Sequence, residues 1–480
     1  MKKSLLLLLL IYKSSLLGQT VLNTYPIDLK RYDEKNQILN VENTTTHDVF
    51  AFVVNSQNLT ILKYNSALFL KDEFTLSRAN IADKTLIGYS FSEDGNPTLY
   101  WSVKDFSTIL VIKYYLENKT YKILNFKYPS SQEYVVGAFQ KNNLFYLVSK
   151  DISKPALTTY TFTNGMVEER IFDFSEFIFK NRKTQSVTFS QILAENPIEK
   201  IESDEYSPLD KSTKKSKMYM MNNHLILTFD HNPKETQIFD LNLENHEILE
   251  KKISQSVTKS PRRLSNSFFY NNKIYQINAT QEELLLDIKD YNSGETLKTF
   301  KVSQNDTIRF KSSPLLMQRD IEKPRELKKT SKFLQRLSYT DIGLSVFKNN
   351  ENTLITLGGV PRMEQVMYAV NDGFNSWDYT QTFHNETVFF ESTLNQNNEF
   401  VNLVQQPLAL DNINYFLDHN RKASLPSSIK FRDYYILGYY DTSKKEYIMR
   451  KFNDGFVQDE PQNPIIDKAV FSKSFPVENP

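Results

Sequence analysis

The sequence predicts an all-β protein made of repeated four-stranded antiparallel sheets. Short runs with an apolar residue at every second position follow one another along most of the chain. Such alternation is typical of strands that bury one face. Asn-Asn steps separate several of the runs, and clusters of runs return at a regular interval. Together these observations indicate short strands joined by tight turns.

Residues 219–253 show one unit of the repeat. The run KMYMM leads to the Asn222-Asn223 step, and the runs LILTF, TQIFDL and ILEKKI follow with polar residues between them. Residues 266–302 repeat this order with SFFY, IYQI, LLLDIKDY and TLKTFKV. Because Asn tolerates the positive φ angles of two-residue hairpins, we expect each Asn pair to join a first strand to a second.

The spacing of the units predicts a β-propeller. Asn pairs begin at 142, 222, 271, 349 and 397, in steps of 80, 49, 78 and 48 residues. Clusters without the pair begin near Asp48 and Asn96. A four-stranded unit of about 48 residues has the size of one blade. We therefore expect about seven four-stranded blades, although eight blades or two small sheet domains fit the same counts.

Two of the steps are longer than one unit by about 30 residues, which predicts insertions between blades at about 175–216 and about 303–338. The second insertion contains an apolar stripe after Pro324, and this stripe predicts a short helix at 325–337. The residues of the stripe are Leu327, Phe333, Leu334 and Leu337.

The turns between third and fourth strands resemble those of known propellers. DLNLENHE at 240–247 and DYNSGE at 290–295 resemble the Asp-x-x-x-Gly-Glu-type turns of quinoprotein-like and related propeller repeats. The resemblance implies the fold and no activity, because the blade tryptophans of the quinone-binding enzymes and the recurring Trp-Asp dipeptides of interaction propellers are missing. We expect one propeller domain over 19–480, closed by a strand from residues 20–46 or from the tail after Phe452.

Residues 1–18 have the features of a secretory signal peptide. Lys2 and Lys3 precede a short apolar core, and the small residue Gly18 precedes the expected cleavage site. The apolar run is shorter than the ~20 residues that span a bilayer, so no membrane span is expected. A lipid-anchored alternative needs a cysteine at the cleavage site, and the chain has none. We expect a secreted or periplasmic protein.

Composition argues against several classes of function. Residues 1–18 contain three Lys and no acidic residue, so the rest of the chain carries 55 Lys and Arg against 57 Asp and Glu. This balance argues against nucleic-acid binding. Zero cysteines exclude disulfides and thiolate chemistry. The sequence has no HExxH, G-x-S-x-G or P-loop motif, so we expect no cofactor, no metal and no catalytic residue, and we expect a monomer.

Topology gathers candidate ligand-binding residues on one face. In a four-stranded meander, the second-to-third loops and the connections between sheets lie on the face opposite the Asn turns. Both insertions belong to that face. The candidates there are Asp230, His231, Arg262, Arg263, Gly358, Gly359, Arg362 and Glu364. Loops on a rigid scaffold are frequent binding sites, although each of these residues alone is also typical of an ordinary solvated loop.

Two further features add to this face. Gly358 and Gly359 are adjacent in a chain with only 12 Gly, and adjacent glycines allow a ligand to approach closely. Trp377 and Tyr379 lie in a polar connection that contains Gly373. They offer a flat platform for sugar rings, and packing of the tryptophan into a hairpin is the alternative interpretation.

The leading hypothesis is an exported binding or scaffold protein that holds a protein or carbohydrate ligand on this face. One alternative is a carbohydrate-active enzyme, in which carboxylates such as Asp230 or Glu364 act as acid and base. A glycosidase mechanism then requires paired carboxyl groups about 5–10 Å apart. Another alternative is a component of an envelope-associated complex.

Overall fold

The computed structural model describes residues 20–455, except for 31–33, 79–80, 105, 127–131, 204, 259–262, 320–323, 350, 363–385 and 404–405. The predicted signal peptide, Arg262, Glu364, Trp377 and Tyr379 lie outside the described residues. The chain divides into two compact units. Among the described residues, unit 1 contains those up to Phe177 and those from Gln406 onward, and unit 2 contains those within Ile178–Gln405.

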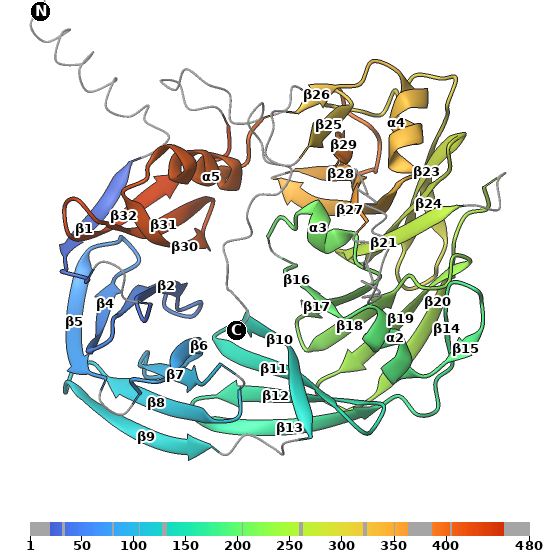
Figure 1. Ribbon diagram of the computed structural model, residues 1–480. Coiled ribbons are helices and arrows are strands. Elements are labelled where there is room, and N and C mark those ends of the chain that lie inside the picture. Colours follow the sequence, from blue (N-terminus) through green and yellow to red (C-terminus); the bar gives the residue numbers. More distant parts are fainter. Residues whose placement is uncertain are drawn as a thin grey trace, which may run out of the picture. The chain divides into compact units, whose positions relative to one another are not determined.

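The structure confirms the predicted all-β class. Seven of the sheets formed by the described residues have four or five strands (Figure 1). Five of the seven contain a meander of four consecutive antiparallel strands, as the repeat predicts. This is the blade pattern of a β-propeller.

Unit 1 contains four sheets of four strands. Three are consecutive meanders: β2 (Gln37–Glu42), β3 (Val49–Val54), β4 (Asn58–Tyr64) and β5 (Leu70–Ser77); β6 (Thr85–Phe91), β7 (Pro97–Ser102), β8 (Ile109–Tyr115) and β9 (Thr120–Phe126); β10 (Glu133–Lys141), β11 (Leu144–Asp151), β12 (Ala156–Thr163) and β13 (Met166–Asp173). The fourth has the order β1 (Val21–Pro26), β32 (Glu446–Phe452), β31 (Tyr434–Asp441) and β30 (Ala423–Phe431), and α5 (Ala409–His419) precedes it.

Strands from both ends of the described chain complete this fourth sheet. β1 pairs antiparallel with β32, and Tyr25 lies opposite Tyr447. The sequence had offered residues 20–46 or the tail after Phe452 for this role, and β1 comes from the first of these. Two segments that are far apart in the sequence therefore form this sheet together.

Alternating apolar residues build the core of unit 1 between neighbouring sheets. Tyr100 on β7 lies with its ring centre 5.3 Å from that of Phe145 on β11 and 4.9 Å from that of Phe162 on β12. All six residues of β3 are buried, because its two faces contact different sheets. Central strands of this kind read as apolar runs without polar positions.

Unit 2 contains three large sheets and one small one. Two large sheets are β16 (Glu199–Ile201), β17 (Ser216–Met221), β18 (His224–Phe229), β19 (Glu235–Asn242) and β20 (Ile248–Ser254), and β21 (Leu264–Tyr270), β22 (Lys273–Ala279), β23 (Glu283–Asp290) and β24 (Thr296–Ser303). The third has the order β26 (Arg325–Glu326), β25 (Leu316–Arg319), β29 (Glu386–Leu394), β28 (Asn352–Pro361) and β27 (Thr340–Asn349). The small sheet is β14 (Phe179–Lys180) with β15 (Ser186–Val187), and the helices are α2 (Phe189–Glu195), α3 (Leu209–Ser212) and α4 (Thr330–Leu337).

The Asn turns adopt the predicted backbone. Asn142, Asn143, Asn222, Asn271 and Asn272 all have positive φ, between 46° and 61°, and each pair joins a first strand to a second. One assignment was wrong. The Asn397-Asn398 turn follows β29, the third strand of its sheet, because β25 from the preceding insertion supplies the fourth strand instead of the chain that follows.

Unit 2 therefore has two distinct ends to its sheets. We call the end with the Asn turns the hairpin face. The other end, where β17, β21 and β27 begin and where β18, β22 and β28 end, is the loop face. The connections that lead into β17 and β27 both end at the loop face.

The insertions contain more structure than the sequence indicated. The first holds α2, whose N-terminus has a capping box between Thr188 and Gln191, and β16, which pairs parallel with β17. The second supplies β25, β26 and α4. Helix α4 begins at Thr330, later than the expected 325, because Arg325 and Glu326 pair with β25. Phe333, Leu334 and Leu337 of the apolar stripe are buried in the core of unit 2.

Candidate functional site

The described candidates divide between the loop face and the strand interior. Asp230 and His231 follow β18, Arg263 precedes β21 and Arg362 follows β28, so all four lie at the loop face of unit 2. Gly358 and Gly359 lie inside β28, where they pair with Gly343 and Ile342 of β27 and with Phe389 and Val388 of β29. The prediction that they lie in a loop was wrong.

The two glycines serve strand packing instead. A Cβ on Gly358 would lie 2.2 Å from the backbone oxygen of Val388, and a Cβ on Gly359 would lie 1.8 Å from Thr340 Oγ1. Both distances are far below van der Waals contact. Glycine is needed here because the neighbouring strand and the Thr340 side chain occupy the space that a side chain would fill.

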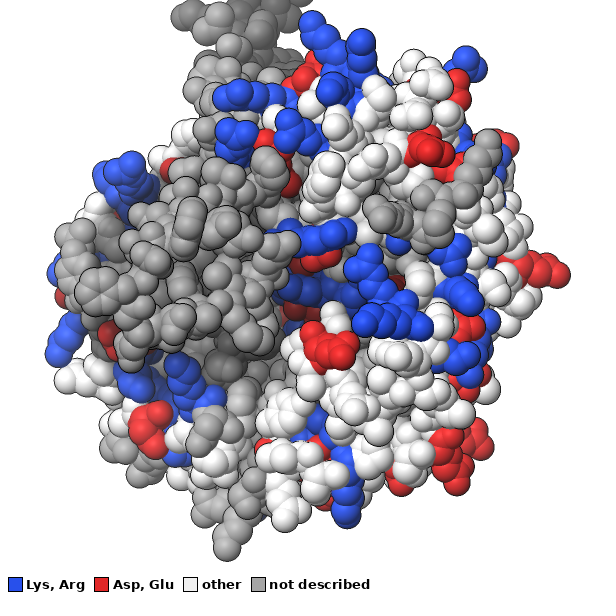
Figure 2. Space-filling view, turned by 45° about the vertical axis from the view of Figure 1, so that its right-hand side comes forward, with Lys and Arg blue, Asp and Glu red and all other residues white. Residues whose placement is uncertain are grey.

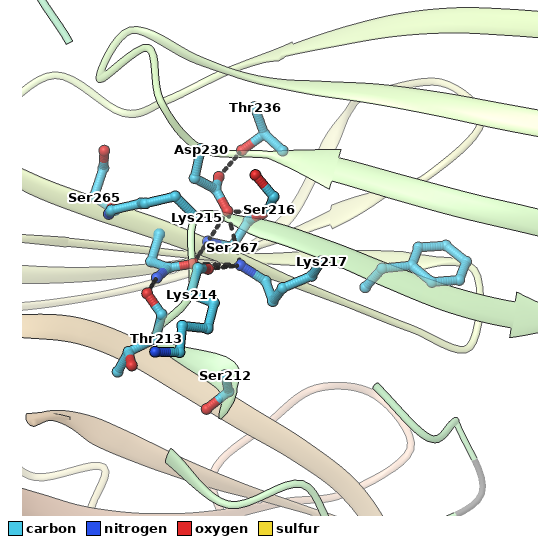
Figure 3. A network of polar contacts seen from close by, with 12 residues as sticks. Ser212, Thr213, Lys214, Lys215, Ser216, Lys217, Asp230, Thr236, Ser265 and Ser267 are labelled. Carbon is cyan, nitrogen blue, oxygen red and sulfur yellow. Dashed lines mark hydrogen bonds and ion pairs between the residues drawn. The ribbon is translucent and has the colours of Figure 1, made fainter. Parts of the chain in front are cut away.

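Asp230 is the centre of a buried polar network (Figure 3). Its carboxylate Oδ2 accepts hydrogen bonds from the backbone N–H of Ser267 at 3.0 Å and from the Ser267 hydroxyl at 2.9 Å. Oδ1 accepts a bond from the Thr236 hydroxyl at 2.9 Å. Lys217 Nζ lies 3.1 Å from Oδ2, and both side chains of this ion pair are fully buried. The carboxylate is therefore fully satisfied.

Lys217 and Asn266 extend the network to all three large sheets of unit 2. Lys217 Nζ also donates to Lys214 O at 2.6 Å and to Asn266 Oδ1 at 2.7 Å. The Asn266 amide donates in turn to Thr213 O at 2.7 Å and to Ile342 O at 2.8 Å. Since these groups belong to the starts of β17, β21 and β27, the network fixes the loop-face ends of the three sheets to one another.

A second branch runs outward between two sheets. The Thr236 hydroxyl accepts bonds from Gln255 at 2.9 Å and from Gln276 at 3.1 Å. Asn278 donates to Gln255 Oε1 at 2.9 Å. All four side chains are buried. The contact between the two sheets is thus polar along its loop-face side, which is unusual for a sheet interface and costly unless its groups are paired.

Electrostatics keep the central pair ionised. Burial by itself favours the neutral acid, but the positive charges of Lys217 and Lys215 outweigh it and lower the pKa of Asp230. Burial lowers the pKa of Lys217, and Asp230 opposes this effect. A general acid near neutral pH needs a raised carboxyl pKa. Asp230 therefore lacks the environment of a general acid.

His231 fastens the first insertion to β17. Its Nε2 lies 2.9 Å from the Ser216 hydroxyl, which itself donates to Asn196 O at 2.9 Å, the C-cap residue of α2. The Ser216 proton is thus used, so His231 donates through Nε2, and its Nδ1 lies 3.4 Å from Asn196 Nδ2. Burial, together with the charges of Lys215 and Lys217, lowers the pKa of His231 to about 4 despite the nearby Asp230. Ser216 is fully buried, so this Ser-His contact is structural.

Cations surround the network at the surface. Lys215 is half-buried, and burial lowers its pKa to about 8, with Asp230 opposing and Lys217 adding to the effect. Lys214 and Arg182 are exposed. Figure 2 shows Lys and Arg side chains gathered over one face of the molecule, with a smaller number of Asp and Glu among them.

The two described arginine candidates have local partners. Arg362 Nε lies 3.3 Å from Asp341 Oδ1, and its Nη2 donates to Thr340 O at 3.1 Å. Arg263 Nη1 donates to Ser256 O at 3.1 Å. The structure brings Asp230 and His231 together with the start of β17, while Arg263 and Arg362 lie on flanking connections.

Sequence reasoning missed two groups of residues. Lys217 and Ser267 are the first residues of the predicted strands KMYMM and SFFY, and Asn266 directly precedes the second of these. Polar residues at the start of an apolar strand were the available signal. The second group is Arg319, Arg336 and Glu386, whose side chains meet at the loop-face end of the third sheet. No local pattern indicates it, because the three residues belong to separate elements.

Two further features are absent from the described part of the chain. In the described part of the chain, no group of three or more His, Asp or Glu side chains is arranged to hold a metal ion. No helix among the described residues is both long enough and apolar enough to cross a bilayer.

Comparisons with known proteins give fold-level likenesses only. No family model matches the sequence, and no curated protein matches it. Among solved structures, similar chains include the Nup133 β-propeller domain of Vanderwaltozyma polyspora (TM-score 0.33, 11% identity, 90% of this chain and 97% of that one) and the WD40 domain of SCAP from fission yeast (TM-score 0.29, 10% identity, 91% and 98%).

A prolyl endopeptidase structure is similar over part of its length, with a TM-score of 0.29 and 8% identity over 88% of this chain and 48% of that one. At these scores none of the three carries an argument about activity. The fold assignment follows from the strand pairing itself. The chain is an all-β protein with the four-stranded repeat of the β-propeller superfamily, without assignment to a specific family.

Proposed function

We propose that the chain is an exported, propeller-type binding or scaffold protein that holds its partner on the loop face of unit 2. The observation that supports this is a contrast within that face. The buried Asp230 carboxylate is fully paired, whereas the cations at the surface, including Lys214 and Arg182, are exposed or half-exposed. A rigid base with an adaptable charged surface is suited to binding.

Export is the first part of the proposal to test. The full chain and a variant lacking residues 1–18 are expressed in a secreting host, and each is located by fractionation and by protease access in intact cells. We expect the full chain outside the cytosol and shortened at its N-terminus by mass spectrometry. Cytosolic, unprocessed full-length protein would contradict export.

Binding to the loop face is the second part. The purified chain is applied to a set of defined glycans and to envelope proteins in cross-linking experiments with mass spectrometry. We expect cross-links and protection to map to the loop face, and Arg182→Glu with Lys214→Glu to weaken binding by about tenfold or more if each loses a charge-assisted contact. Lys348→Glu is the matched control, since Lys348 is an exposed lysine at the hairpin end of β27. Equal losses in both variants would contradict a loop-face site.

A further inference from the structure

We propose that Asp287, Gln276 and Asn278 bind a monovalent metal cation, sodium or potassium, between two sheets of unit 2. The three residues belong to the sheet of β21–β24. The amides of Gln276 and Asn278 bond to Thr236 and Gln255 of the neighbouring sheet, so the site lies beside the buried network around Asp230. All three residues of the site are buried, so it is separate from any partner site on the surface.

Strand pairing brings the three side chains together. Gln276 on β22 lies directly opposite Asp287 on β23, and Asn278 follows Gln276 by two residues. Residues in these two relations lie on the same side of a sheet, and the Cβ atoms of an opposite pair are about 4.5–5.5 Å apart. Each of the three residues is at most 1% exposed. A ligand at this position must therefore be very small.

The hydrogen bonds around the site determine which atom of each amide is left over. The Thr236 hydroxyl donates its proton to the buried carboxylate of the network, so its oxygen accepts from both Gln255 and Gln276. Gln276 Nε2 also donates to Ile253 O at 3.3 Å. Because Gln255 uses its nitrogen on Thr236, its Oε1 accepts from Asn278 Nδ2 at 2.9 Å. Gln276 and Asn278 therefore have their nitrogens paired and their oxygens left over.

Three buried oxygens have no hydrogen-bond donor in the described part of the chain. They are Gln276 Oε1, Asn278 Oδ1 and Asp287 Oδ2. The other carboxylate oxygen, Asp287 Oδ1, accepts a bond from the Thr299 hydroxyl at 2.6 Å. A buried polar group without a partner is costly, and a buried charge without one is costlier still. Since all three atoms are acceptors, the missing partner is a hydrogen-bond donor or a cation.

A cation accounts for these oxygens better than a water molecule does. A water molecule has only two protons to donate, so it leaves one of the three oxygens unpaired and leaves the carboxylate charge in place. A metal cation binds several oxygens at once and neutralises the carboxylate. Carboxylate and amide oxygens are ligands that such hard cations prefer. The lack of cysteine and of clustered histidine does not argue against a site of this kind.

The charges favour a monovalent ion. The site has a single carboxylate, and the calcium affinity of oxygen sites depends on the number of charged ligands. Lys289, also buried, lies two residues beyond Asp287 on β23. Its ammonium group donates to Ser254 O at 2.5 Å and not to Asp287 Oδ2. A divalent ion would add two positive charges near this lysine, whereas a monovalent ion adds only the one that the carboxylate balances.

The test uses the full chain and simple salts. The protein is dialysed into choline chloride, whose cation is too large for the site, and sodium, potassium or calcium chloride then replaces choline at constant ionic strength. We expect sodium or potassium to raise the unfolding temperature in a saturable way and calorimetry to show one ion bound per chain. Asp287→Asn keeps the shape of the side chain and removes its charge, so it should weaken the affinity about tenfold or more.

Asp290→Asn is the matched control, because Asp290 ends the same strand and its carboxylate accepts bonds from the following turn. It should leave the ion dependence unchanged. Equal unfolding temperatures of the unchanged chain in sodium, potassium and choline would overturn the site, as would a response to calcium alone. Equal ion dependence in folded Asp287→Asn would overturn it as well.

Hydrogen exchange of the unchanged chain locates the ion even if Asp287→Asn does not fold. We expect sodium or potassium to slow exchange in β22 and β23, the strands that carry the three oxygens. Slower exchange only in other strands would place the ion elsewhere and overturn the site.

Discussion

The hairpin face and the loop face of unit 2 are built from the same strands but by different means. At the hairpin face, a backbone hydrogen bond joins the turn after the third strand to the Asn turn, and two sheets share this arrangement. Leu243 N donates to Asn223 O at 2.8 Å, and Tyr291 N donates to Asn272 O at 3.0 Å. At the loop face, the bonds are made by side chains from different sheets, namely Asp230, Lys217 and Asn266.

This difference separates local from global stabilisation. A hairpin turn satisfies its own backbone, and its replacement should affect one turn. The loop-face network holds ionised and amide groups that have no access to water, so loss of one partner leaves another charged or polar group buried and unpaired. We therefore expect substitutions at the loop face to lower the free energy of unfolding much more than those at the hairpin face.

The largest effect is expected for Asp230→Ala. The substitution leaves Lys217 buried without its counter-charge, and breaking a buried ion pair on one side typically costs about 3–5 kcal/mol. Urea unfolding followed by circular dichroism gives the loss in free energy, and hydrogen exchange at β17 and β21 locates it. Asp28→Ala is the control, since the Asp28–Lys445 pair in unit 1 is exposed and screened by water. Similar losses of free energy in the two variants would contradict a larger contribution from the buried loop-face network.

The second effect is a pH dependence caused by His231. Its pKa is lowered to about 4 in the folded protein, mainly by burial, and is about 6.5 in an unfolded chain. The unfolded state therefore binds the proton first, so stability is complete above pH 6.5, falls as the pH drops towards 4, and loses no more below that. A shift of this size corresponds to about 3 kcal/mol.

His231→Gln isolates this contribution because glutamine does not titrate. Stability measured from pH 7 to pH 4 should fall less steeply in the variant than in the unchanged chain, and the two curves should diverge within this window. The acid-induced losses from carboxylates elsewhere are common to both proteins. Parallel curves would show that His231 titrates in the folded protein as it does in water.

A third, intermediate effect is expected for Gly358→Ala. The added Cβ meets a backbone carbonyl of β29 at 2.2 Å, and a strand cannot rotate away as a side chain can. Overpacking of this kind typically costs about 1–3 kcal/mol. Thr353→Ala, near the hairpin end of the same strand, is the control. Thermal unfolding measures both, and a neutral Gly358→Ala would mean that β28 and β29 separate easily at the loop face.

The same contrast explains how much could be predicted from the sequence. The Asn turns that begin at 142, 222 and 271 were predicted correctly because the residues that cause them are adjacent, and the period of the turns was enough to assign the loop face. The fourth strand of the third sheet was not predicted. This strand, β25, precedes β27 in the chain, and it pairs with the distant strand β29, so that Leu316 lies opposite Phe389. Local alternation carries no information about such a pairing.

The candidate site shows the same limit. Asp230 and His231 were found because topology places the ends of second strands on the loop face. Their partners were not found, because they belong to other parts of the chain. Ser267, which contacts Asp230, lies in a different sheet, and Asn196, which contacts His231, lies in the first insertion. Gly358 and Gly359 were misplaced because glycine marks close approach of any kind, and here the approaching atoms belong to a neighbouring strand and not to a ligand.

The smallest effect is expected at the hairpin face, and it has either sign. Asn272 has a φ of 56°, a backbone angle that costs an alanine about 1 kcal/mol and a glycine very little. Asn272→Ala should therefore lower the free energy of unfolding by about 1 kcal/mol or less, and Asn272→Gly should leave it unchanged or raise it slightly. Urea unfolding of both variants beside Asp230→Ala places the two faces on one scale. If Asn272→Ala lowers the free energy of unfolding as much as Asp230→Ala does, the turn stabilises more than itself. A local backbone effect alone cannot cost more than the ~1 kcal/mol that alanine loses at a positive φ.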